Sequence, residues 1–181
     1  LEELKKAEKF IFIETFIIGP GLFWDSILEV LCQKAAAGVD VRVIYDDVGC
    51  LNTLPPKYYL TLRQQGIKTV VFNPLMPALS TYLNYRDHRK ICVIDGNTGF
   101  NGGINLADEY INARERLGYW KDTAVMLQGE GVCNLTFMFL RMWRHASAER
   151  DDFDQFRPTC SARGDGYVQS FADSPLDRHN V

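Results

Sequence analysis

The chain has 181 residues, which fits one domain of ordinary size. Apolar residues make up 46% of it and charged residues 24%, a balance that argues against a disordered chain. Lysine and arginine number 20 against 23 aspartates and glutamates, so the net charge of −3 excludes a protein that wraps nucleic acid by bulk positive charge. No run of about 20 apolar residues, the length that a membrane-spanning helix needs, occurs in the sequence.

The five cysteines are widely spaced and form no C-x-x-C pair, which argues against a zinc ribbon and against a disulfide framework. We therefore expect reduced thiols in a domain that faces the cytoplasm. The chain begins at Leu1 within a charged helical pattern, so we also expect it to be a piece of a longer protein.

The first part of the sequence alternates between strand and helix patterns. A short amphipathic helix is expected near residues 1–7, strands rich in Phe, Ile and Val at 10–18, 39–45 and 67–72, and helices at 22–37 and 58–65. This order predicts right-handed crossover connections. The expected fold class is therefore α/β, with a mixed, mostly parallel sheet sandwiched between helices.

The second part begins with a long connection at residues 73–87, and connections of this length are usually functional. A hairpin is then expected from strands at 90–94 and 98–101, followed by a strand at 122–127, a helix at 132–148 and a strand-like stretch at 167–171. The chain after Arg150 is otherwise polar and irregular.

His88, Lys90 and Asp95 form the pattern H-x-K-x-x-x-x-D on a strand that enters a tight turn. Side chains alternate along a strand, so His88 and Lys90 are expected on one face and Asp95 on the other. The lysine disfavours the imidazolium form of His88, which favours a neutral nucleophile, and it can neutralise a phosphate oxygen. Asp95 is expected to hold the turn through bonds to backbone groups.

Gly102, Gly103 and Asn105 follow this hairpin. Paired glycines let backbone N–H groups approach an anion closely, and an asparagine amide adds a side-chain donor. We therefore expect His88, Lys90 and Asn105 to converge on one phosphoryl group. Arg86 and Arg89 raise the local positive charge, although the whole chain is acidic.

The pattern H-x-K-x-x-x-x-D followed by G-[SG]-x-N resembles the signature of the phospholipase D superfamily. Five further segments are similar to bacterial cardiolipin synthases in order and spacing: IYDDVG, FNP, LNYRDHRKICVIDG, GFNGGINLADEY and WKDTAVMLQG. The resemblance runs from about Phe10 to Trp143. It implies a phospholipase D-like catalytic half-domain at residues 1–150 and an irregular connection at 151–181 toward a missing second half.

The resemblance implies four catalytic residues. His88 is the nucleophile that forms a phosphatidyl-histidine, and Lys90 binds the phosphate. Asp95, the third signature residue, has a largely structural role. Asp122 matches a family carboxylate that accepts a hydrogen bond from the nucleophilic imidazole, which sets its tautomer and stabilises its positive charge.

The resemblance also implies that Gly102, Gly103 and Asn105 bind the substrate, with Asn105 holding a phosphate oxygen. Gly103 stands where many superfamily members carry serine, a departure that is usual for cardiolipin synthases. The family chemistry implies no metal and no cofactor. We accordingly do not expect a metal site at the adjacent Asp46 and Asp47, whose side chains would face opposite ways on a strand.

The implied function is phosphatidyl transfer: one phosphatidylglycerol gives its phosphatidyl group to His88, a second one accepts it, and glycerol leaves. The expected partners are phosphatidylglycerol and a membrane surface, with no nucleic acid. The full-length protein is expected at the cell membrane, facing the cytoplasm, whereas this chain alone is expected to be soluble. The apolar residues Leu75, Met76, Leu79 and Leu83 are candidates for lipid contact.

Members of the superfamily pair two signatures, with one histidine as nucleophile and the other as general acid. This sequence has one, because His145 and His179 lack a lysine two residues on and are expected to be ordinary surface residues. The chain is therefore expected to need a second half in the same full-length chain or a homodimer partner. Alone, it is expected to be inactive or very weak.

Two other functions stay open: a phospholipase D or phosphodiesterase that uses water as acceptor, and a non-catalytic module for membrane docking or dimerisation. Glu14 is also unexplained, because a carboxyl group in a buried apolar strand needs partners or a proton. It is expected either beside the active site or within an internal hydrogen-bond network.

Overall fold

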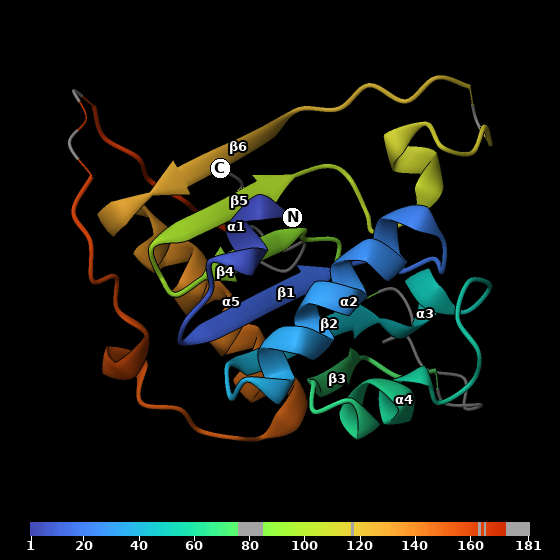
Figure 1. Ribbon diagram of the computed structural model, residues 1–181, viewed down its shortest axis with the longest axis horizontal. Coiled ribbons are helices and arrows are strands. Elements are labelled where there is room, and N and C mark those ends of the chain that lie inside the picture. The colour runs from blue at the N-terminus through green and yellow to red at the C-terminus, as the bar shows by residue number, and fades with distance from the viewer. Residues whose placement is uncertain (76–84, 117, 163, 165, 173–181) are drawn as a thin grey trace.

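The computed structural model describes residues 1–75, 85–116, 118–162, 164 and 166–172. Six strands form one sheet in the order β3-β2-β1-β4-β5-β6 (Figure 1). The strands are β1 (Phe10–Thr15), β2 (Asp40–Asp46), β3 (Lys68–Phe72), β4 (Ile91–Ile94), β5 (Thr98–Gly102) and β6 (Ala124–Gln128). The expected mixed α/β sheet is confirmed.

The sheet has a parallel and an antiparallel half. β1, β2 and β3 are parallel, because a helix crosses between each strand and the next. β4 runs antiparallel to β1, and β4, β5 and β6 continue antiparallel to one another. Parallel pairings are thus two of the five, a smaller share than the sequence predicts, because the last three strands lack helical crossovers.

Helices cover both faces of the sheet (Figure 1). The α-helices are α1 (Glu2–Lys5), α2 (Leu22–Ala36), α3 (Asp47–Cys50), α4 (Tyr58–Gln64) and α5 (Val132–Ser147), and the 3-10 helices are η2 (Asp108–Ile111), η3 (Gly129–Gly131) and η4 (Phe153–Phe156). α1, α2 and α4 lie on one face, and α5 lies on the other. No helix among the described residues is long and apolar enough to cross a membrane.

The core has two parts, one on each face of the sheet. All six residues of β1 are buried, as expected for a strand covered on both sides. Ile11 and Ile13 pack with Trp24 and Leu31 of α2, whereas the alternate residues of β1 pack with α5. The stacked rings of Phe12 and Phe139, with centroids 4.5 Å apart, join β1 to α5.

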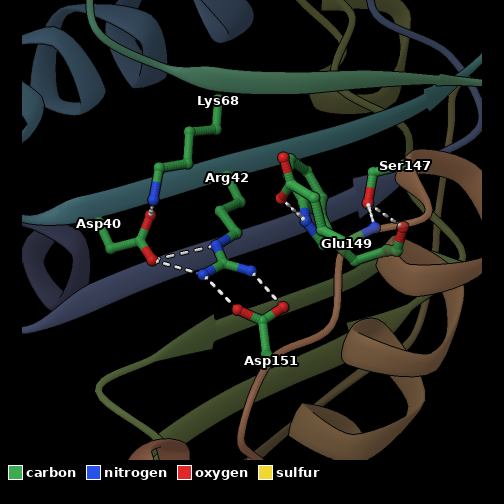
Figure 2. Close-up of polar contacts among 7 residues, drawn as sticks. Asp40, Arg42, Lys68, Ser147, Glu149 and Asp151 are labelled. Carbon is green, nitrogen blue, oxygen red and sulfur yellow. Dashed lines mark hydrogen bonds and ion pairs between the residues drawn. The ribbon is translucent and has the colours of Figure 1, made fainter.

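A buried arginine ties the chain after α5 to the sheet (Figure 2). Arg42 of β2 contacts Asp40 at 2.7 Å and Asp151 at 2.7 Å, and Lys68 also pairs with Asp40 at 2.8 Å. The guanidinium lies 5.3 Å from the ring centroid of Trp143. A guanidinium can be buried in this way because two carboxylates satisfy its donors.

The segment after α5 folds back along the molecule. Phe156 of η4 is buried in the α5-side core, and the side chain of Asn97 accepts hydrogen bonds from the backbone of Thr159 and Cys160. The expected strand at 167–171 is wrong, because these residues form no ladder and Tyr167, Val168 and Phe171 are exposed. All five cysteines are free.

Candidate active site

Most of the predicted site residues lie near one edge of the sheet, the one formed by the ends of the strands on the right in Figure 1. β1 and β5 end there, and β4 and β6 begin there, because Glu14 is paired with Ile91, Ile91 with Asn101, and Gly102 with Ala124. The segments that carry His88, Lys90, Asn105 and Asp122 adjoin these strand ends. The hairpin topology thus brings together residues that are far apart in sequence.

His88 and Lys90 both lie close to the aromatic ring of Phe16. The imidazole of His88 is 4.9 Å from the ring of Phe16 between centroids, and the Lys90 ammonium is 5.4 Å from the centroid of the same ring. Both residues were expected on a strand, but β4 begins at Ile91, so they belong to the extended segment before it. The Lys90 ammonium donates a hydrogen bond to the His88 carbonyl oxygen at 2.6 Å.

The surroundings shift both titratable groups toward their neutral forms. Partial burial and the neighbouring Lys90 lower the pKa of the His88 imidazole below its usual value of 6.5. Burial lowers the pKa of the Lys90 ammonium to about 8. His88 is exposed whereas Lys90 is 8% exposed. Near pH 7 the site therefore offers a neutral imidazole beside an ammonium that is still mostly charged.

The arginines beside His88 are occupied by carboxylates. Arg86 contacts Asp46 at 3.2 Å, and Arg89 contacts Asp87 at 3.0 Å. Within residues 85–90, Lys90 is the cation that no described carboxylate contacts within salt-bridge distance. The positive charge left available at the site is therefore that of Lys90.

Asp122 lies at the same edge but is not bonded to His88. Its carboxylate accepts hydrogen bonds from Trp120 Nε1 at 2.9 Å and from Thr123 N at 2.7 Å. These bonds and that of the Gly103 N–H lower the pKa of Asp122. A Cβ atom at Gly103 would lie 2.5 Å from Asp122 Oδ1, so glycine allows this close approach.

Asn105 is buried, and both ends of its amide have partners. Its Oδ1 accepts a hydrogen bond from Ile17 N at 3.0 Å, and its Nδ2 donates to Tyr110 Oη at 2.7 Å. The ring of Tyr110 packs edge-on against Trp120, with centroids 4.7 Å apart. Asn105 thus holds the loop after β1, and Tyr110 lies beside it.

Asp95 lies at the opposite end of β4 from Lys90. Its carboxylate accepts hydrogen bonds from the backbone N–H groups of Glu8, Lys9 and Phe10, each at 2.8 Å. These bonds hold the entry into β1, whereas the sequence predicts bonds within the hairpin turn.

Sequence reasoning did not identify Phe16, Tyr110 or Asp87 as neighbours of the site. Phe16 and Tyr110 follow strand ends, and no spacing rule links them to His88. For Glu14 the sequence left two alternatives open, a place beside the active site or one within an internal hydrogen-bond network. The structure places it against Arg89, at 2.8 Å. The described residues contain no group of three or more His, Cys, Asp or Glu residues arranged to hold a metal ion.

Of the four loop residues predicted to contact lipid, the structure describes Leu75. Leu75 is 45% exposed, and its N–H donates to the Asp47 carboxylate at 2.7 Å. Met76, Leu79 and Leu83 lie outside the described residues. The loop therefore remains a prediction.

Comparison with known proteins identifies the family. Residues 1–132 match the family described as cardiolipin synthase, phospholipase D-like domain. The chain is 55% identical over 185 residues to an uncharacterized protein of Streptococcus mutans, covering 99% of this chain and 39% of that protein. It is 40% identical over 184 residues to a cardiolipin synthase of Alkalihalophilus pseudofirmus, covering 100% of this chain and 36% of the synthase.

A solved structure supports the same fold. The phospholipase D family member Nuc from Salmonella typhimurium is 15% identical, with a TM-score of 0.57, over 80% of this chain and 84% of that one. The fold is that of a phospholipase D-like domain, and the chain belongs to the cardiolipin synthase, phospholipase D-like domain family. It spans little more than a third of the length of the curated relatives it matches.

Proposed function

We propose that this domain transfers phosphatidyl groups between lipid phosphodiesters, with His88 as the covalent nucleophile. The imidazole attacks phosphorus, the P–O bond to the leaving alcohol breaks, and a phosphatidyl-histidine forms. An acceptor alcohol then attacks phosphorus and frees the imidazole. By analogy with the cardiolipin synthase relatives, the donor and the acceptor are both phosphatidylglycerol, and glycerol leaves.

The observation that carries this proposal is the ammonium of Lys90 beside His88. Because Arg86 and Arg89 are paired with carboxylates, Lys90 is the cation positioned to meet the negative charge of a phosphodiester. Its partial burial strengthens the attraction, since charge interactions weaken less in a low-dielectric site than in water. Near neutral pH the imidazole is unprotonated and therefore nucleophilic.

The other site residues receive supporting roles. We assign substrate binding to the turn that carries Gly102, Gly103 and Asn105. Asp122 acts through its neighbours, since its carboxylate is bonded to Trp120, Thr123 and Gly103. Asp95 is proposed as a structural residue, which its three bonds to the start of β1 support.

Head-group exchange tests this function. Vesicles of phosphatidylglycerol are incubated with labelled glycerol, and the label that enters the lipid is counted. His88→Ala should lower exchange by about 10³-fold or more, as removal of a nucleophile usually does. His145→Ala is the matched control, since this exposed histidine lies on α5, and it should leave exchange unchanged.

The same assay identifies the acceptor. Cardiolipin as the product supports the transferase, whereas phosphatidic acid as the main product identifies a hydrolase that uses water. Undiminished exchange in His88→Ala contradicts the proposed nucleophile.

A further inference from the structure

The two sequence neighbours of His88 belong to a largely buried group of ionisable side chains. Glu14 of β1 and Asp87 are both nearly inaccessible, with side chains 0% and 1% exposed. Arg89 lies between them, with its Nε 2.8 Å from Glu14 Oε1 and 3.0 Å from Asp87 Oδ1. One guanidinium therefore serves two buried carboxyl groups.

The two carboxyl groups differ in how well they are satisfied. Asp87 Oδ1 accepts hydrogen bonds from the backbone N–H and from Nε of Arg89. Neither oxygen of Glu14 has a hydrogen bond of good geometry, and Asp87 Oδ2 also lacks one. A buried carboxylate is stable only when it is paired and hydrogen-bonded. These contacts favour ionised Asp87 and protonated Glu14.

A proton on Glu14 satisfies the atoms that otherwise lack partners. Its hydroxyl can donate to Asp87, which contacts the same Arg89 Nε atom and whose Oδ2 otherwise lacks a donor. Burial, and then the charge of Asp87, raise the pKa of Glu14 well above its usual value of 4.5, although Arg89 opposes this shift. A carboxylic acid and a carboxylate that share one proton avoid the repulsion between two buried negative charges.

The other charged groups around this pair are already engaged. At the end of β2, Asp46 pairs with Arg86 and accepts a hydrogen bond from the Asp87 N–H at 3.0 Å. The ammonium of Lys90 is bonded to the His88 carbonyl. On α5, which covers this face, the ring of His145 lies 6.2 Å from Phe72.

This pair acts on the segment that carries the nucleophile. His88 has no strand ladder to hold it, since β4 begins only at Ile91. Its two neighbours in sequence, Asp87 and Arg89, both point inward to Glu14, so the imidazole of His88 points the other way, toward Phe16.

We propose that Glu14 is a positioning residue: as a neutral carboxylic acid it donates a hydrogen bond to Asp87 and, with Arg89, fixes the segment on which His88 is presented. This inference rests on the proposed role of His88 as nucleophile. It extends that role, because it assigns a buried side chain, which does not touch the substrate, to the orientation of the imidazole.

Carboxyl NMR tests the protonation directly. The chain is labelled with carbon-13 at glutamate carboxyl groups and titrated with acid and base. One resonance should keep its protonated chemical shift at pH values where the exposed glutamates have ionised. That resonance should vanish in Glu14→Gln and persist in Glu149→Gln, the control, whose side chain bonds to Trp143. Ordinary titration of Glu14 overturns the inference.

Proton NMR tests the positioning. The His88 and Phe16 rings are close enough for a nuclear Overhauser effect between their protons. Glu14→Gln keeps a neutral donor toward Asp87, so this effect and the His88 chemical shifts should stay as in the unaltered chain. Glu14→Leu has no donor, so the effect should weaken and the His88 resonances should shift. An effect that persists unchanged in Glu14→Leu overturns the inference.

A second variant covers the case in which Glu14→Leu does not fold. Asp87→Asn removes the negative charge that raises the pKa of Glu14, so the Glu14 carboxyl should ionise at a lower pH than in the unaltered chain. An unchanged titration in Asp87→Asn contradicts the pairing. None of these readouts requires turnover, so a failure of the proposed function leaves them interpretable.

Discussion

His88 and Lys90 are two titratable residues that must hold opposite protonation states at the same pH. In the proposed mechanism the imidazole must be neutral to attack phosphorus, and the ammonium must be charged to stabilise the phosphate. Burial lowers the pKa of both, so the interval in which both conditions hold runs from below 6.5 to about 8. Physiological pH falls within this interval.

The rate of phosphatidyl transfer should therefore be bell-shaped in pH. It should rise with pH as His88 loses its proton, below 6.5, and fall as Lys90 loses its proton, near 8. The pH dependence of kcat/KM measures these values for the free enzyme. In Lys90→Arg the rate should drop, since the geometry differs, and the alkaline limb should disappear because a guanidinium does not titrate there. An alkaline limb that survives in Lys90→Arg contradicts the assignment.

Asp95 should affect stability rather than chemistry. Its carboxylate accepts three backbone hydrogen bonds at the start of β1 and lies at the far end of β4 from Lys90. Hydrogen bonds to charged groups contribute about 1.5–3 kcal/mol each. Asp95→Ala should lower the free energy of unfolding by at least about 2 kcal/mol, and Asp95→Asn by less, since it keeps one acceptor oxygen. Urea denaturation gives both values, and an Asp95→Ala chain as stable as the unaltered one contradicts the structural role.

The sequence predicted the location of the site residues better than it predicted their hydrogen-bond partners. His88, Lys90 and Asn105 do lie at one edge, because the hairpin fixes their proximity locally. The bonds of Asp122 and Asn105 to Trp120 and Tyr110 depend on how loops fold across the ends of strands, and no periodicity encodes such loops.

Among the elements, β2 has a role beyond its place in the sheet. It presents Arg42 to Asp40 and Asp151, so the chain after α5 is tied to the sheet by a buried ion pair (Figure 2). Removing one partner of such a group leaves uncompensated charge in the interior, which is costlier than replacing the group with apolar atoms.

Arg42→Ala should consequently lower the free energy of unfolding by about 3–5 kcal/mol. Arg42→Met should cost less, because its side chain retains contact with the rings of Phe12 and Trp143. Thermal and urea unfolding of the two variants measure the difference. Equal losses would mean that the lost ion pairs, rather than the packing of the side chain against these rings, determine the effect.

The elements themselves were largely predictable. Dense Phe, Ile and Val mark β1, β2 and β3, and the glycines Gly38 and Gly66 mark the ends of α2 and α4. The exception at 167–171 has apolar residues in a strand-like order but no partner strand to pair with. The sequence predicts that β4 begins at Lys90, one residue too early. The strand pattern includes Lys90, but the hydrogen-bonded ladder begins at Ile91.

In the described part of the molecule, both the candidate site and the neighbouring outer strand of the sheet have exposed residues. His88 is exposed, and β6 is an edge strand on which Val125 and Met126 are 52% and 53% exposed. Exposed apolar residues on an edge strand are typical of a surface that pairs with another chain or domain. The relatives are more than twice as long as this chain. We propose two candidate partners for this surface: a further domain of the kind that this extra length can hold, and a second copy of this chain.

If two copies pair to complete the site, the exchange rate per chain should rise with protein concentration. A general acid contributes typically 10²–10⁴-fold, so a lone chain should exchange slowly and a paired chain much faster. Sedimentation measures pairing over the same concentrations. A monodisperse monomer with rapid exchange contradicts the requirement for a second histidine.

The proposed covalent intermediate on His88 can be detected directly by mass spectrometry. The chain is mixed with short-chain phosphatidylglycerol at neutral pH, quenched in alkali to preserve phosphohistidine, and digested for tandem mass spectrometry. We expect a phosphatidyl adduct on His88, none on His145, and no adduct in His88→Ala. An adduct on a different residue, or transfer of the lipid group with no covalent intermediate at all, would contradict the proposed mechanism.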